Sequence, residues 1–176
     1  MKKILAVLLC TLATGVMAQS NKDEGFYAEL GVMQANYKDS VVKFNNSMGA
    51  LKAGYNFNKA FAVEGMIAGN IGSANFYIGS TYITAQVQNA YGLYGKGSID
   101  VSEGVSLYGK IGLTNGEVTA SSRYASSFTS GTSASYGVGI QANINKEVYA
   151  TLDYLSYYNK NGISVTGPSI NLGYKF

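Results

Sequence analysis

The sequence contains no histidine and one cysteine, Cys10, and these two shortages exclude most catalytic chemistry. Without histidine the chain has no Ser-His-Asp triad, no imidazole general base and none of the commonest metal ligand. A single thiol, in a segment that we expect to be removed, leaves neither thiol catalysis nor a zinc-thiolate site. Paired carboxylates remain formally possible through Glu29, Glu64 and Asp153, but lysine partners explain these acids better. We therefore expect no enzyme, no cofactor and no metal.

Long apolar runs are also missing. After the first residues, no window approaches the roughly eighteen consecutive apolar residues of a membrane-spanning helix. The N-terminus itself has the charged start and the short apolar run, 4–12, of a secretory signal, closed by Val16-Met17-Ala18. Leu8-Leu9 before Cys10 is a poor lipoprotein motif, so we expect plain cleavage. The sequence predicts a signal peptide over 1–18 and one mature domain over 19–176.

An excess of one charge is absent once the signal is removed. Without Lys2 and Lys3 the mature chain keeps 11 basic residues against 10 acidic residues. The basic isoelectric point therefore belongs largely to the signal, and no nucleic-acid binding is expected.

Glycine and tyrosine are abundant, with 22 and 15 residues, whereas proline occurs once and tryptophan not at all. This composition favours β-structure, since glycine interrupts almost every apolar stretch that could form a helix. The end of the chain shows the pattern most clearly, because apolar side chains alternate with small or polar ones over 169–176. A strand of this kind has one apolar face and one polar face.

The same alternation predicts eight strands of roughly ten residues, the length that a tilted transmembrane strand needs. They span 26–36, 48–57, 61–70, 87–99, 105–113, 133–144, 148–157 and a closing strand through 169–176. Long links over 37–47, 71–86, 114–132 and 158–165 alternate with short turns. This predicts an all-β fold, an eight-stranded antiparallel up-and-down transmembrane β-barrel of the bacterial outer membrane, with short turns and both termini periplasmic. The alternative is a soluble periplasmic barrel, which would hold its apolar face inside.

Charged residues within the strands all fall on the non-apolar face. In a barrel of eight strands this face lines a narrow lumen, where buried charges must pair. We expect Lys52 to lie diagonally beside Glu64 and Lys175 beside Glu29. Lys96 and Lys110 are expected diagonally beside each other, with Asp153 or Glu64 as the acid. The lumen network therefore comprises Glu29, Lys52, Glu64, Lys96, Lys110, Asp153 and Lys175, and we interpret it as a plug rather than an open channel.

The long links mix cations with aromatic side chains, a combination that suits contact with lipopolysaccharide phosphates, glycans or proteins. The binding candidates are Lys38, Lys43, Phe76, Tyr77, Tyr82, Arg123, Tyr124, Phe128, Tyr157, Tyr158 and Lys160. Soluble, variable loops without a ligand are the alternative. Phe57, Phe61, Tyr174 and Phe176 fall beside the short turns, where an aromatic girdle belongs.

Three stretches carry a resemblance to a known group: Tyr108-Gly109, Tyr136-Gly137-Val138-Gly139-Ile140-Gln141 and Leu172-Gly173-Tyr174-Lys175-Phe176. The chain resembles the small eight-stranded outer-membrane barrels, namely outer-membrane protein X, the attachment-invasion proteins, the opacity proteins and the barrel domain of outer-membrane protein A. The resemblance covers nearly the whole mature chain.

This resemblance implies a surface role, in which loops bind a host or environmental ligand, or a role in envelope integrity, within outer-membrane lipid and lipopolysaccharide. Leu172, Tyr174 and Phe176 are similar to the signal read by the barrel-assembly machinery, although Asn171 stands where that signal often has glycine. Several members are called porins, so a narrow porin that passes small solutes or ions is the alternative function.

Overall fold

The computed structural model describes residues 24–39, 43–72, 74–78, 81–122, 126–160 and 162–176. The expected signal peptide, 1–18, lies outside these residues. Within them, no helix is both long enough and apolar enough to cross a membrane.

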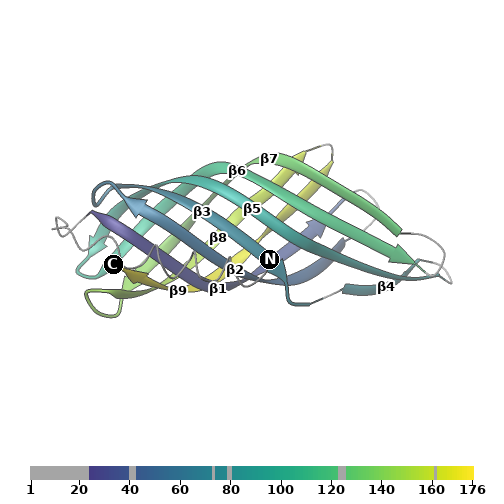
Figure 1. The fold of residues 1–176 in the computed structure, drawn as a ribbon, viewed down its shortest axis with the longest axis horizontal. Coiled ribbons are helices and arrows are strands. Elements are labelled where there is room, and N and C mark those ends of the chain that lie inside the picture. Colours follow the sequence, from purple (N-terminus) through teal and green to yellow (C-terminus); the bar gives the residue numbers. More distant parts are fainter. Residues whose placement is uncertain (1–23, 40–42, 73, 79–80, 123–125, 161) are drawn as a thin grey trace, which may run out of the picture.

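The described residues form nine antiparallel strands, of which eight close into a barrel (Figure 1). Except for β3 and β4, strands that follow each other in the chain are paired, and the ring closes through β1–β9 and β3–β5 pairing. The short β4 pairs only with the start of β5 and stands outside the ring. The strands are β1 Gly25–Lys38, β2 Lys43–Asn56, β3 Phe61–Asn70, β4 Ala74–Ile78, β5 Thr81–Ser102, β6 Val105–Ser122, β7 Ser126–Asn143, β8 Val148–Lys160 and β9 Ile163–Lys175. The predicted eight-stranded fold is confirmed.

The two faces of the wall follow the alternation of the sequence. Leu30, Ile111 and Val138 are 68%, 71% and 68% exposed on the outside, whereas their neighbours Glu29 and Lys110 are buried inside. A soluble barrel would bury the apolar set instead. This wall is built to meet hydrocarbon, in which exposed apolar side chains cost nothing.

Several strands are longer than the sequence predicted. β5 has 22 residues and β6 and β7 have 18 each, while about ten cross a bilayer. The four segments that we expected to be long loops therefore consist mostly of strand, and this part of the prediction was wrong. The ladder needs only paired backbone groups, so it continues where serine and threonine replace the apolar face. Figure 1 shows β6 and β7 running past the barrel toward the end where β4 lies.

The opposite end carries the short turns, and asparagine side chains shape two of them. Asn58 Oδ1 accepts from the backbone N–H groups of Ala60 and Phe61 at 2.8 and 2.9 Å. Asn145 Oδ1 likewise accepts from Glu147 and Val148 at 2.8 and 2.6 Å. The turn after β5 uses Gly104 at φ +77°, a conformation that side chains disfavour. We call this the turn end, and the other the long-strand end; the C-terminus lies at the turn end (Figure 1).

Candidate functional site

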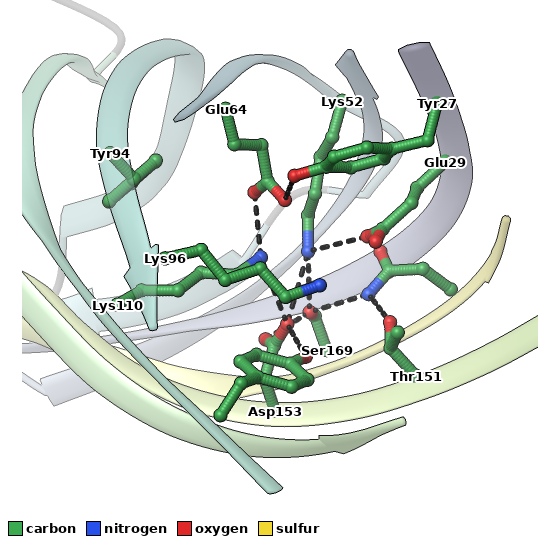
Figure 2. A network of polar contacts seen from close by, with 12 residues as sticks. Tyr27, Glu29, Lys52, Glu64, Tyr94, Lys96, Lys110, Thr151, Asp153 and Ser169 are labelled. Atoms are coloured by element: carbon green, nitrogen blue, oxygen red, sulfur yellow. Dashed lines mark hydrogen bonds and ion pairs between the residues drawn. The ribbon is translucent and has the colours of Figure 1, made fainter. Parts of the chain in front are cut away.

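A layer of charged side chains crosses the middle of the lumen. We call it the charge layer, and its six members come from six strands of the wall and are at most 5% exposed. They are Glu29, Lys52, Glu64, Lys96, Lys110 and Asp153. Three lysines face three carboxylates, so their formal charges cancel, and Figure 2 shows them converging on one region of the interior.

Direct ion pairs connect the strands, three of them between non-adjacent strands and one, Lys52–Glu29, between the adjacent strands β2 and β1. Lys110 Nζ on β6 lies 2.6 Å from Glu64 Oε1 on β3, and 3.8 Å from Asp153 Oδ2 on β8. Lys52 Nζ on β2 lies 3.2 Å from the same Asp153 oxygen and 3.7 Å from Glu29 Oε2. Ser169 also donates to Asp153 from β9. Asp153 is therefore the point at which both lysines meet (Figure 2).

These partners differ from the predicted ones. Lys52 does lie diagonally beside Glu64 in the β2–β3 register, yet its amine reaches Glu29 and Asp153 instead. Lys96 and Lys110 were expected to be diagonal neighbours, but they are directly opposite each other on β5 and β6. Glu29 is the residue directly opposite Lys52 on β1, whereas Asp153 lies across the lumen. The lysine side chain is long enough to reach both, so wall adjacency alone does not decide its partners.

Two like charges held opposite each other require compensation. Lys110 obtains it from Glu64. Lys96 Nζ lies 4.4 Å from the centroid of the Tyr108 ring and 5.4 Å from that of Tyr27, and it donates to Gln141 Oε1 at 3.2 Å. The negative faces of two aromatic rings therefore help to hold this cation.

Three tyrosines that the predicted lumen network did not include complete the charge layer. Tyr27 donates to Glu64 at 2.9 Å. Tyr108 donates to Asp153 at 2.9 Å and Tyr149 to Glu29 at 3.1 Å. Each carboxylate thus receives one phenol hydrogen bond. The signal was available in the sequence, because all three tyrosines lie on the inward face of their strands.

A glycine stands directly opposite each of these tyrosines on the neighbouring strand. The pairs are Tyr27 with Gly54, Tyr108 with Gly139 and Tyr149 with Gly173. A Cβ atom added at any of the three glycines would collide with the tyrosine ring. The glycines therefore make room for rings that lie across the neighbouring strand.

Lys175 lies at the turn end of the lumen. Its Nζ donates to Asn143 Oδ1 at 3.2 Å and lies 5.3 Å from the centroid of the Tyr149 ring. Tyr149 of β8, and not Lys175 of β9, donates a hydrogen bond to Glu29. Lys175 does lie diagonally beside Glu29 in the β1–β9 register, as predicted, because it stands opposite Tyr27 while Gly173 stands opposite Glu29. The predicted pairing of the two side chains was wrong, since Glu29 forms its ion pair with Lys52 and accepts from Tyr149.

The charge layer has the chemistry of a structural network. Its carboxylates are engaged by lysine or tyrosine donors, and the described residues contain no cluster of three or more potential metal ligands. One buried oxygen, Glu29 Oε2, has no hydrogen-bond partner among the described residues and faces Lys52 Nζ at 3.7 Å. Buried networks of paired charges rigidify a core, and removal of one partner is costly.

The binding candidates of the long links have separate positions. Lys38, Lys43 and Lys160 are exposed at the long-strand end. Tyr158 is half-buried, and Tyr157 is only 4% exposed because it points into the lumen, so its assignment to a binding surface was wrong. Phe76 and Tyr77 in β4, Tyr82 in β5 and Phe128 in β7 are described by backbone position alone, and Arg123 and Tyr124 lie outside the described residues.

The exposed lysines, which we call the rim lysines, lie on neighbouring strands. Lys38 on β1 is directly opposite Lys43 on β2, about 5 Å away across the ladder. On its other side Lys38 pairs with Ser164 of β9, which pairs with Asn159 of β8, the residue before Lys160. Four consecutive strands thus present three cations at one edge.

An acidic group borders this edge. Tyr37 donates to Asp39 Oδ2 at 3.1 Å. Burial, with the neighbouring Asp39 carboxylate, raises the pKa of Tyr37 to about 12. Tyr37 therefore stays a neutral donor at physiological pH, and Asp39 is directed toward the phenol.

Comparison with known proteins agrees with this architecture. The attachment invasion locus protein of Yersinia enterocolitica is 28% identical over 149 residues, which cover 84% of this chain and 83% of that protein. The crystal structure of the Yersinia pestis attachment invasion locus protein, in complex with the heparin analogue sucrose octasulfate, superposes with a TM-score of 0.66 at 25% identity, covering 88% of this chain and 99% of that one. Neisserial surface protein A shares the fold, with a TM-score of 0.64 at 18% identity over 86% of this chain and 97% of that one.

The family model of the outer membrane protein beta-barrel domain matches residues 6–176. Because it spans nearly the whole sequence and the strands close as that fold requires, the chain belongs to the family of outer-membrane protein β-barrel domains.

Proposed function

We propose that this outer-membrane barrel is a non-enzymatic surface protein whose long-strand end faces outward and contacts anionic glycans, sulfated or phosphorylated. The observation that carries the proposal is the rim, where Lys38 lies directly opposite Lys43. Like charges in directly opposite positions repel each other. A polyanion bound across both strands would remove that repulsion and gain two charge-assisted hydrogen bonds.

A related protein supports the choice of ligand class. The Yersinia pestis attachment invasion locus protein was crystallised with a heparin analogue, sucrose octasulfate. We propose a ligand of the same class for this chain because its rim lysines are exposed and could bind sulfate or phosphate groups. Lipopolysaccharide phosphates offer the same anionic chemistry in the membrane that surrounds the barrel.

We infer that the turn end and both termini face the periplasm. The short turns suit the side from which no ligand is bound, and the projecting strands suit the outside. The terminal Tyr174 and Phe176 are exposed, with ring centroids 5.1 Å apart, so an assembly machinery can read Leu172, Tyr174 and Phe176 from the lipid face.

The lumen of such a protein is expected to be closed by the charge layer. Lys52, Asp153, Lys110 and Glu64 link strands on different sides of the interior and fill the width that an open pore would need. This supports the surface role over the narrow porin.

Binding to immobilised heparin, with the barrel in phosphatidylcholine nanodiscs, tests the proposed function. The double variant Lys38→Gln/Lys43→Gln should bind about tenfold more weakly, since each exposed charge contact contributes on the order of 0.7 kcal/mol. The matched control is Lys59→Gln/Lys146→Gln, which removes the same charge at the exposed turn end. Equal affinities of the two double variants would overturn the proposal.

A further inference from the structure

The half of the lumen nearer the long-strand end is apolar, in contrast to the charge layer beneath it. Met33, Met48 and Met66 are at most 3% exposed and all point inward. They are the only methionines after residue 18. Buried alanine, valine and tyrosine side chains from other strands join them in one cluster. A surface protein with a purely structural lumen has no need of this lining at the end that faces water.

This cluster lines a partly open cavity of about 210 Å³. Seven of the eight barrel strands contribute to its wall, including Met33, Met48 and Ala90. Two hydroxyl groups in the lining already have partners, because Thr114 bonds to Tyr94 at 2.6 Å and Tyr37 donates to Asp39. Water bound here would find few polar partners, and cavities of this kind stay dry or bind apolar molecules.

Beside the cavity, the described residues of β7 and β8 are no longer joined by backbone hydrogen bonds. Their ladder ends at the Tyr136–Ser156 pair, although β7 begins ten residues earlier, at Ser126, and β8 continues to Lys160. Beyond this pair, serine hydroxyls replace the ladder: Ser135 donates to the Ser156 carbonyl at 2.8 Å, and Ser133 accepts from the Asn159 N–H at 3.1 Å. We call this segment the seam.

The seam coincides with the edge of the lipid-facing band. Tyr136 and Tyr154, two large outward side chains of these strands, are 56% and 53% exposed just below it. Gly131 of β7 and Tyr158 of β8 stand on its two sides and also line the cavity. The Tyr158 side chain lies against Gly131 and covers the gap, so an apolar molecule from the outer surface of the bilayer would enter by displacing this one ring.

We propose that this cavity binds a small apolar molecule or the end of a hydrocarbon chain, which enters along the seam. A cavity of about 150 Å³ holds benzene, so about 210 Å³ suits a group of about eight to ten carbon atoms. The flexible, polarisable methionine side chains adapt to ligands of different shape. The charge layer forms the floor, so the cavity holds its ligand and does not pass it on.

Methyl NMR of the barrel in nanodiscs tests this proposal with naphthalene as the probe. The protein carries ¹³C-methyl methionine, and the signals are assigned by Met→Leu exchange at 33, 48 and 66. Met33 and Met48 line the cavity, whereas Met66 belongs to the cluster but not to the cavity wall, which makes it an internal reference. Saturable shifts of Met33 and Met48, larger than that of Met66, are expected.

Two alanine variants separate binding in the cavity from partition into lipid. Ala90→Leu fills the cavity and should weaken the naphthalene response at least tenfold, whereas Ala53→Leu adds the same atoms on the exposed outer wall of β2, away from the seam, and should leave it unchanged. If Ala90→Leu fails to fold, the contrast between Met33 and Met66 in the unaltered protein decides. Non-saturating shifts, or equal shifts at all three methionines, would overturn the proposal.

The same samples show whether the natural ligand is a lipid acyl chain or a free small molecule. Without probe, nuclear Overhauser contacts between the Met33 or Met48 methyl and lipid chains, lost with deuterated lipid, would support a bound acyl chain. Their absence, together with naphthalene saturation, would support a free small molecule.

Discussion

Lys52 Nζ on β2 lies 3.2 Å from Asp153 Oδ2 on β8, although β1 and β9 stand between these two strands in the wall. The contact joins residues 101 positions apart in the chain and bridges the lumen. Both side chains are at most 4% exposed, so neither charge is hydrated by bulk water. The ion pair can form only when the sheet has closed into a ring, because only then do β2 and β8 face each other across the lumen.

Lys52→Met is expected to lower the free energy of unfolding by about 3–5 kcal/mol, because it leaves Glu29 and Asp153 with too little positive charge in a buried layer. Urea unfolding in lipid vesicles measures the change, with tyrosine fluorescence as the signal since the chain has no tryptophan. The control is Lys146→Met in an exposed turn, which should alter stability by less than about 0.5 kcal/mol. Similar losses in the two variants would contradict a special role for Lys52.

Gly173→Ala should destabilise the barrel by about 1–3 kcal/mol, because the new methyl group meets the Tyr149 ring and must displace it from Glu29. The same unfolding experiment measures this loss. Gly97→Ala is the matched control, since an added Cβ atom there has no neighbour within 4 Å. If Gly173→Ala is as stable as Gly97→Ala, the ring does not depend on the glycine for its position.

The faces of the strands could be predicted from the sequence alone. Glu29 lies inside and Leu30 outside because side chains alternate along any strand, and the apolar set identified the lipid side. The ends of the strands could not be predicted in the same way. Beyond the bilayer both faces are wet, so the alternation disappears in the serine-rich parts of β6 and β7 while the backbone ladder continues.

Which side chains pair inside the lumen could be predicted from the sequence only in part. Register places Lys52 beside Glu64 on the wall, but lysine reaches across the interior, and the contact with Asp153 depends on how the ring closes. The inward position of Tyr157 could have been predicted, since it shares the parity of Asp153 and Leu155. The three methionines of the apolar half were visible on the inward face, yet only the closed barrel brings them around one cavity.

The charge layer should prevent steady ion flow. We expect planar-bilayer recordings of the unaltered protein to show no stable conductance, because the paired side chains fill the lumen. Truncation of a charge-balanced set, Lys52→Ala with Asp153→Ala, should produce conducting steps, whereas Ile111→Ala on the lipid-facing wall should not. A stable conductance in the unaltered protein would favour the porin function instead.

Ser133→Ala should loosen the seam between β7 and β8. The Ser133 hydroxyl accepts from the Asn159 N–H at 3.1 Å and donates to the Asn159 carbonyl at 3.3 Å, so its removal leaves the backbone of β8 without these bonds. Loss of one hydrogen bond of about 1 kcal/mol predicts that the Asn159 amide exchanges about fivefold faster, which hydrogen-exchange NMR in nanodiscs measures directly. Ser106→Ala removes a different hydroxyl bond, from Ser106 to Asp100 at the turn end, and should leave Asn159 unaffected. An unchanged exchange rate in Ser133→Ala would mean that something other than this hydroxyl holds the seam, and a rise in both variants would indicate general loosening of the barrel.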